Sequence, residues 1–179
     1  MKKLTKITLS SVVALGTLFG VGYSVDNLHV NEAYAAQNQT GQPYYNYNGY
    51  AAKGTPSFVL DPAFINALKY DNFKINGVKI PYTTGKKALP NEIKNVQKYD
   101  QTFAITNSNG TVARFVSFNA NGKLTTKQLM NAYGNKLKLV NSSQDVKVYV
   151  YNPNKQHYGI AFYTNNGKVQ NIMIGHFAV

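Results

Sequence analysis

The C-terminal part of the chain contains four stretches with the apolar alternation of β-strands, at residues 137–140, 146–151, 157–163 and 169–177. Short polar turns separate them, at residues 141–145, 152–154 and 165–167. Turns of this length join neighbouring antiparallel strands, whereas a parallel pair needs a crossover of roughly a dozen residues or more. The pattern therefore predicts an antiparallel meander.

Two helices are predicted before this meander. The first begins at Asp61, a good N-cap followed by proline, and ends near residue 70. The second follows Thr125, which forms a capping box with Gln128, and it stops at Gly134. We predict an α+β fold, with an antiparallel sheet and two main helices covering one face. A helix followed by hairpin strands occurs in both halves, which suggests two helix-plus-hairpin units.

The middle of the chain is predicted to form further strands. Asn76 and Gly77 favour a tight turn between residues 73–75 and 78–80. Alternation places Tyr99, Gln101 and Phe103 on one face of a strand that continues to residue 105, and another strand covers residues 112–118. The polar residues 86–95 are predicted to form a loop with a helical turn.

The first 35 residues have the features of a removed signal peptide. A lysine-rich start precedes an apolar stretch at residues 7–23, and Ala33 and Ala35 occupy the −3 and −1 positions of a cleavage site. Cleavage leaves 144 residues: a Tyr-, Asn-, Gln- and Gly-rich segment at 36–55 and a single domain at 56–179. A second apolar run is missing, so no membrane span is predicted for the mature part. We expect a secreted, extracellular protein.

Charge is the strongest indication of function. The leader contains three of the 19 basic residues and two of the seven acidic ones, so the mature part keeps 16 against five, a formal charge of +11. A charge this large attracts anionic partners from a distance. The candidate partners are nucleic acid, anionic lipid and anionic wall polymers.

The inventory of reactive groups predicts a protein that is not an enzyme. The chain lacks cysteine, which excludes thiol nucleophiles and thiolate metal sites. His157 and His176 are the two histidines of the mature part, and neither has a motif partner. The carboxylates show no catalytic or metal-ligating spacing. No cofactor and no metal are expected.

A binding surface is predicted on residues 146–151. If the three valines of this strand face the core, Lys147, Tyr149 and Tyr151 face outward, and His157 and Tyr163 of the next strand lie beside them. Lysines can contact phosphates while tyrosines stack on any base, which suits single-stranded nucleic acid without sequence specificity. The alternative is that these tyrosines pack beneath another element as ordinary core residues.

Several stretches of the chain resemble the immunodominant staphylococcal antigen B family. They are YYNYNGY at 44–50, the run 58–80, KYDQTF at 98–103, AYG at 132–134 and IGH at 174–176. The resemblance covers nearly the whole mature domain. It implies a secreted or surface-associated staphylococcal antigen with sequence-independent affinity for extracellular nucleic acid and no enzymatic activity. Residues 83–91, which resemble an extra loop, and the absence of a basic C-terminal tail depart from the family pattern.

Two functions therefore remain in view. The first is binding of single-stranded or duplex nucleic acid, or of an anionic wall polymer, through lysine–phosphate contacts and tyrosine stacking. The alternative is an interaction or inhibitor protein that binds a host or bacterial protein. An exposed apolar patch would favour the second function, and a continuous positive stripe the first. The oligomeric state does not follow from the sequence.

Overall fold

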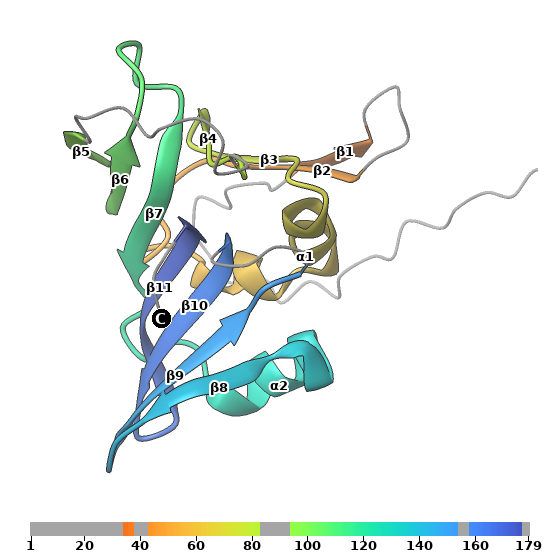
Figure 1. Cartoon of the computed structure of the whole chain (residues 1–179), viewed down its shortest axis with the longest axis vertical. Helices are drawn as coiled ribbons and strands as arrows, with labels where there is room; N and C mark the ends of the chain where they lie inside the picture. Colours follow the sequence, from red (N-terminus) through yellow and green to blue (C-terminus); the bar gives the residue numbers. More distant parts are fainter. Residues whose placement is uncertain (1–33, 38–42, 83–93, 154–157, 177–179) are drawn as a thin grey trace, which may run out of the picture. The chain divides into compact units, whose positions relative to one another are not determined.

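The computed structural model describes residues 34–37, 43–82, 94–153 and 158–176. Its larger sheet is wholly antiparallel, in the order β5-β6-β7-β11-β10-β9-β8 (Figure 1). These strands are β5 Lys94–Lys98, β6 Gln101–Ile105, β7 Ala113–Asn119, β8 Lys138–Ser142, β9 Val146–Tyr151, β10 Tyr158–Asn165 and β11 Lys168–His176. Strands β8 to β11 pair in sequence order, so the predicted meander is confirmed.

A smaller sheet combines the N-terminal segment with the predicted hairpin, in the order β1-β2-β3-β4. Its strands are β1 Tyr34–Gln37, β2 Pro43–Tyr47, β3 Phe73–Ile75 and β4 Val78–Lys79. β2 and β3 are parallel, and the other pairs are antiparallel. The expected turn at Asn76 and Gly77 forms, with φ angles of 49° and 78°. The predicted signal-peptide cleavage point lies within β1.

Both predicted helices are present, with the predicted caps. Helix α1 spans Pro62–Lys69, and the Asp61 carboxylate accepts a hydrogen bond of 2.8 Å from the Ala63 amide. Helix α2 spans Thr126–Tyr133, with a complete capping box between Thr125 and Gln128. Short 3₁₀ helices precede α1 at Pro56–Leu60 and follow α2 at Gly134–Lys136.

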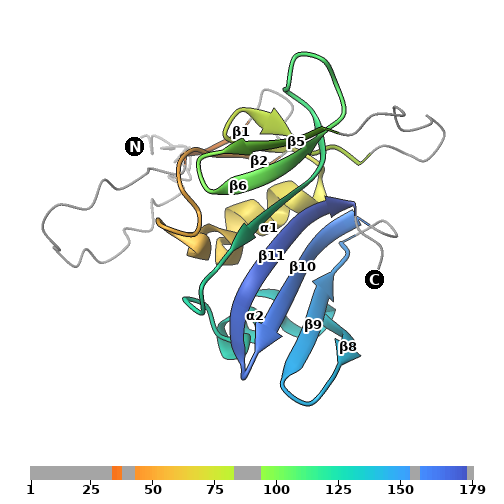
Figure 2. The ribbon, with the colours of Figure 1, turned by 90° about the vertical axis from the view of Figure 1, so that its left-hand side faces the viewer.

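The helices lie on one side of the larger sheet, behind it in the view of Figure 2. One core cluster joins this side of the sheet to both helices and to the smaller sheet. The first part of the tyrosine-rich run, residues 44–47, contributes to it as part of β2. Tyr47 stacks on Phe58 with ring centroids 4.0 Å apart, and Tyr45 packs edge-on against Phe64 at 5.5 Å. These tyrosines are structural.

One local prediction in the middle of the chain is wrong. Tyr99 does not lie on a strand face with Gln101 and Phe103, because β5 and β6 form a hairpin in which Lys98 pairs with Gln101. The chain must reverse between these two residues, and Tyr99 therefore occupies the loop with a φ of 56°. Most of the predicted loop at 86–95 lies outside the described residues, and its last two residues belong to β5.

Candidate nucleic-acid interface

The outward assignment of Tyr149 and Tyr151 is wrong. Their side chains are only 7% and 4% exposed, and both belong to the main core cluster. The Tyr151 ring lies 5.0 Å from that of Tyr133 on α2. Burial raises the pKa of the Tyr151 hydroxyl. These tyrosines cannot stack on a ligand without opening the fold.

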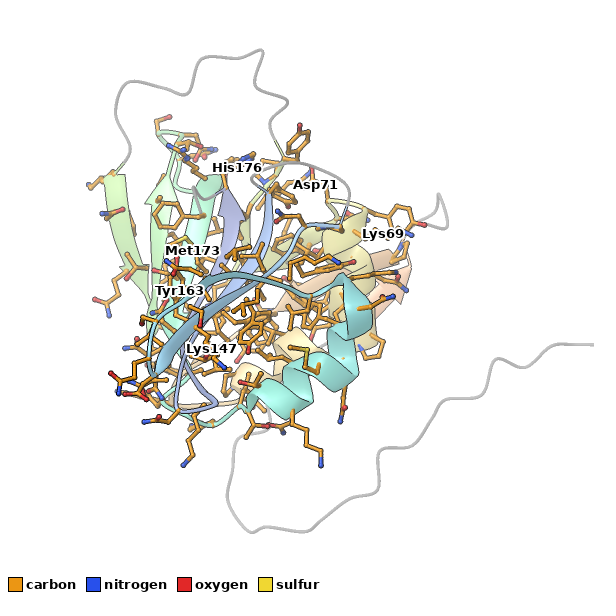
Figure 3. All side chains as sticks on the ribbon, turned by 60° about the horizontal axis from the view of Figure 1, so that its bottom comes forward. Lys69, Asp71, Lys147, Tyr163, Met173 and His176 are labelled. Atoms are coloured by element: carbon orange, nitrogen blue, oxygen red, sulfur yellow. The ribbon has the colours of Figure 1, made fainter. Side chains whose placement is uncertain are left out.

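The valines of β9 face the opposite side of the sheet. Val148 and Val150 form a small separate cluster with Ala161 of β10. Tyr163 pairs with Val148, and it packs partly buried on this cluster together with Met173 of β11 (Figure 3). The predicted alternation was correct, but the assignment of its two faces was reversed, because α2 covers the tyrosine side.

The four predicted site residues that the structure describes therefore do not form one surface. Lys147 is exposed at the start of β9, where its neighbours in the sheet are Thr164 and Ser142. Tyr163 lies on the side away from α2, whereas Tyr149 and Tyr151 are in the core. His157 lies outside the described residues. Of the predicted set, Lys147 keeps a position suited to contacting an anion.

The open side of the larger sheet carries mostly neutral side chains. Asn171 of β11 donates a hydrogen bond of 3.1 Å to the Asn119 side chain on β7, and Ser117 lies opposite Met173. This side offers polar and apolar contacts but little charge. A polyanion is therefore better matched to other parts of the surface.

Lysines provide the charge of the rest of the surface. Ten of the twelve lysines in the described ranges are exposed, and Lys69 and Lys98 are partly exposed. They are distributed over both sheets, both helices and the connecting segments. Lys74 and Lys79 lie directly opposite each other on β3 and β4, and both are exposed. The Cβ atoms of directly opposed residues in an antiparallel pair lie about 5 Å apart, so like charges at these positions repel each other.

The carboxylates do little to offset this charge, because the described ranges contain only four of them against twelve lysines. Of the four acidic residues within the described ranges, Asp61 caps α1 and Asp71 accepts from the Tyr82 amide at 3.0 Å. Asp100 accepts from the amides of Ala51 and Lys53 at 2.7 and 2.8 Å. Asp145, in the β8–β9 turn, is the fourth.

Asp100 belongs to a polar network that joins three distant segments. The Gln101 side-chain amide donates to the Gly49 carbonyl at 2.9 Å, and the Asn76 amide donates to the same carbonyl at 3.1 Å. The Asn76 amide also donates to the Gln101 side-chain oxygen. We call Gly49, Asn76, Asp100 and Gln101 the clasp. It fixes the segment after β2 against the β3–β4 and β5–β6 turns.

Two tyrosines beside the clasp were not predicted as site residues. Tyr50 and Tyr99 are 43% and 53% exposed, and their ring centroids are 4.9 Å apart at an interplanar angle of 83°. The Lys53 ammonium lies 5.8 Å from the centre of the Tyr50 ring. The sequence pattern assigns Tyr50 to the Tyr-, Asn-, Gln- and Gly-rich segment at 36–55 and Tyr99 to a strand. Tyr99 carried no sequence signal, because the pairing of Lys98 with Gln101 that places it in a turn is visible only in the structure.

The described part of the chain lacks two kinds of feature. No helix there is long and apolar enough to cross a bilayer. Within the same ranges, no group of three or more His, Asp or Glu side chains is arranged to hold a metal ion.

Comparison with known proteins supplies the family. The family model for immunodominant staphylococcal antigen B matches residues 44–174. The chain belongs to this family. It is 37% identical over 179 residues to immunodominant staphylococcal antigen B of Staphylococcus aureus strain USA300, covering 98% of this chain and 96% of the relative. The same protein from strains COL and N315 gives the same values. No solved structure gives a significant match.

Proposed function

We propose that this antigen B family protein is a secreted, non-enzymatic protein that binds nucleic acid or other polyanions without sequence specificity, through lysine–phosphate contacts. The observation that carries the proposal is the excess of exposed lysines over carboxylates, three of which accept hydrogen bonds from backbone amides. Lys74 and Lys79 are the sharpest example, because a phosphate between them would relieve their repulsion. The signal-peptide pattern and the relatives' printed name, a staphylococcal antigen, support a location outside the cell.

The mode of binding follows from the residue types. Lysine is a flexible point charge that meets phosphate without reading base edges, and the chain has a single arginine, the residue that most often reads guanine. Each phosphate contact releases condensed counterions. If four to six lysines make contact, log K should fall against log salt with a slope of roughly −3 to −5.

The test uses protein purified from culture medium, whose intact mass should correspond to a chain starting at Ala36. Affinity for labelled single strands and duplexes is measured over a salt series, with an anionic wall polymer as competitor. We expect steep salt dependence, indifference to base sequence and intact nucleic acid after incubation. A flat salt dependence would contradict electrostatic binding, and degradation of the nucleic acid would contradict a non-enzymatic role.

A second function has one observation in its favour. Leu139 and Val140 on the edge strand β8, and Val146 on β9, are 51%, 45% and 43% exposed. Exposed apolar side chains on an unpaired edge suit a protein partner that adds a strand. Salt separates the two functions, because apolar association would persist at the concentrations that abolish lysine–phosphate binding.

A further inference from the structure

Tyr50 and Tyr99, which we call the tyrosine pair, are each about half exposed to water, at 43% and 53%. The rings meet edge to face, at 4.9 Å and 83°. In this arrangement, the ring that presents its edge has neither face covered by its partner. Aromatic pairs in the core are stabilised by burial, but this pair is outside it. Its rings are available to a flat ligand.

Tyr99 also occupies a backbone position that disfavours its side chain. It is the first residue of a two-residue hairpin loop, and only it has a positive φ, 56°. This is the pattern of a type II′ turn, in which glycine is preferred at that place. A bulky residue there costs on the order of 1–2 kcal/mol. Glycine would form the turn more easily, so folding does not explain the tyrosine.

The clasp and the core hold both rings in place. Asp100 accepts from the amides of Ala51 and Lys53, on the segment that carries Tyr50. The buried Tyr47 hydroxyl donates to the Tyr50 carbonyl at 2.7 Å. The two segments are thereby fixed against each other before any ligand arrives. A fixed site loses less conformational entropy when it binds.

Three lysines lie on or next to the segments that carry the pair. Lys53 lies 5.8 Å from the centre of the Tyr50 ring, and Lys98 precedes Tyr99. The Lys123 ammonium donates to the Ala52 carbonyl at 2.7 Å, which adds a third positive charge next to this segment. The nearby Asp100 carboxylate accepts three hydrogen bonds, from two backbone amides and the Gln101 side chain, which hold it toward the clasp. A flat ring with attached phosphates fits this combination.

We infer that Tyr50 and Tyr99 form a stacking site for a base of single-stranded nucleic acid, with Lys53 and Lys98 contacting the adjacent phosphates. The inference rests on the proposed polyanion binding and adds a preference to it. Bases of a duplex are stacked on each other and cannot reach the rings, so the site distinguishes single strands from duplexes.

The test compares the mature protein with Tyr99→Gly and Tyr50→Ala by fluorescence anisotropy, using a thymine single strand, a duplex of equal length and polyphosphate. Removing either ring should weaken single-strand binding about 5- to 100-fold, while the salt slope stays the same. Duplex and polyphosphate affinities should change less than about twofold. Tyr99→Phe should keep most of the affinity, because its ring still stacks.

Tyr99→Gly is the informative variant, because glycine suits the turn and its loss of binding cannot be assigned to unfolding. The matched control is Tyr70→Ala, since Tyr70 is 45% exposed and has the Lys69 ammonium 5.2 Å from its ring centre, but it has no facing ring in the described chain. It should bind normally.

The outcomes separate the inference from the proposed function. Unchanged single-strand affinity in both tyrosine variants, with a steep salt slope, overturns the stacking site and leaves polyanion binding intact. Equal losses for single strand, duplex and polyphosphate also overturn it, because the patch would then act only through charge. A wild-type protein without salt-dependent binding overturns both.

Discussion

Two regions of this protein combine lysine with tyrosine, and they use the tyrosines in opposite ways. In β9, Tyr149 and Tyr151 are buried in the core, Tyr151 against Tyr133 of α2, and Lys147 is exposed at the start of the strand. Beside the clasp, Tyr50 and Tyr99 are exposed and Lys53 lies against one of the rings. The residue types are therefore insufficient to identify a binding surface. Whether such a region is a binding surface depends on which elements pack on each side of it.

The comparison is tested most strongly by truncating a tyrosine in each region. Tyr151→Ala should lower the free energy of unfolding by about 3 kcal/mol or more, because it removes a buried ring that contacts Tyr133. Tyr50→Ala should cost only about 1 kcal/mol, the size of an exposed aromatic pair. Urea unfolding measures both values.

The two truncations should affect single-strand binding in the reverse order, with Tyr50→Ala weakening it more than Tyr151→Ala. The folded fraction of Tyr151→Ala should bind single strands with wild-type affinity, since this ring does not reach the surface. If Tyr151→Ala were as stable as the wild type and bound poorly, the outward assignment of β9 would be correct after all.

The second prediction concerns Tyr47, the buried tyrosine that holds Tyr50. Burial, followed by the charge of Asp100, raises the pKa of Tyr47 from 10.0 to about 12. The folded state then binds the Tyr47 proton more tightly than the unfolded state. The contribution of this hydroxyl to the free energy of unfolding is therefore fully present below pH 10. It is lost as the pH rises from 10 towards 12, by about 2 kcal/mol.

Tyr47→Phe should remove this part of the alkaline loss. The variant should be less stable than the wild type below pH 10 by about 1 kcal/mol, because the Tyr50 carbonyl loses its donor. The difference should shrink or reverse near pH 12. Urea unfolding at both ends of this range is the measurement, and parallel stability curves would show that Tyr47 does not titrate in this window.

Much of the fold could be predicted because its signals are local. The capping box at Thr125 and Gln128, the Asp61 cap and the Asn76–Gly77 turn each depend on residues within a few positions. The meander follows from short connections in the same way. Alternation along β9 likewise showed which side chains share a face.

The position of the site could not be predicted because its determinants are distant in the sequence. Which face of β9 is covered depends on Tyr133, and alternation is silent about α2. The clasp connects Gly49 to Gln101 across 52 positions. Tyr99 is hidden for a different reason, because its turn lacks the glycine or asparagine that normally marks a positive φ. Exposed aromatics in unfavourable turns are thus easier to find in a structure.

The smallest expected effect concerns Lys74 and Lys79, which lie opposite each other on the β3–β4 hairpin. Lys79→Gln should increase stability by about 0.5 kcal/mol at low salt, because it removes a like-charge pair. The gain should fade as salt rises, since the Debye length is already about 10 Å at 0.1 M. Lys147→Gln is the matched control, because Lys147 is exposed between the neutral residues Thr164 and Ser142. Lys147→Gln should show no such gain.

Both substitutions should nevertheless reduce the salt slope of polyanion binding by somewhat under one unit if each lysine contacts a phosphate. If Lys79 lowers the stability of the hairpin but raises the affinity for a polyanion, then binding of that ligand explains why a lysine occupies this position. If Lys79→Gln destabilises the hairpin at low salt, or leaves the slope unchanged, these lysines are ordinary surface charges.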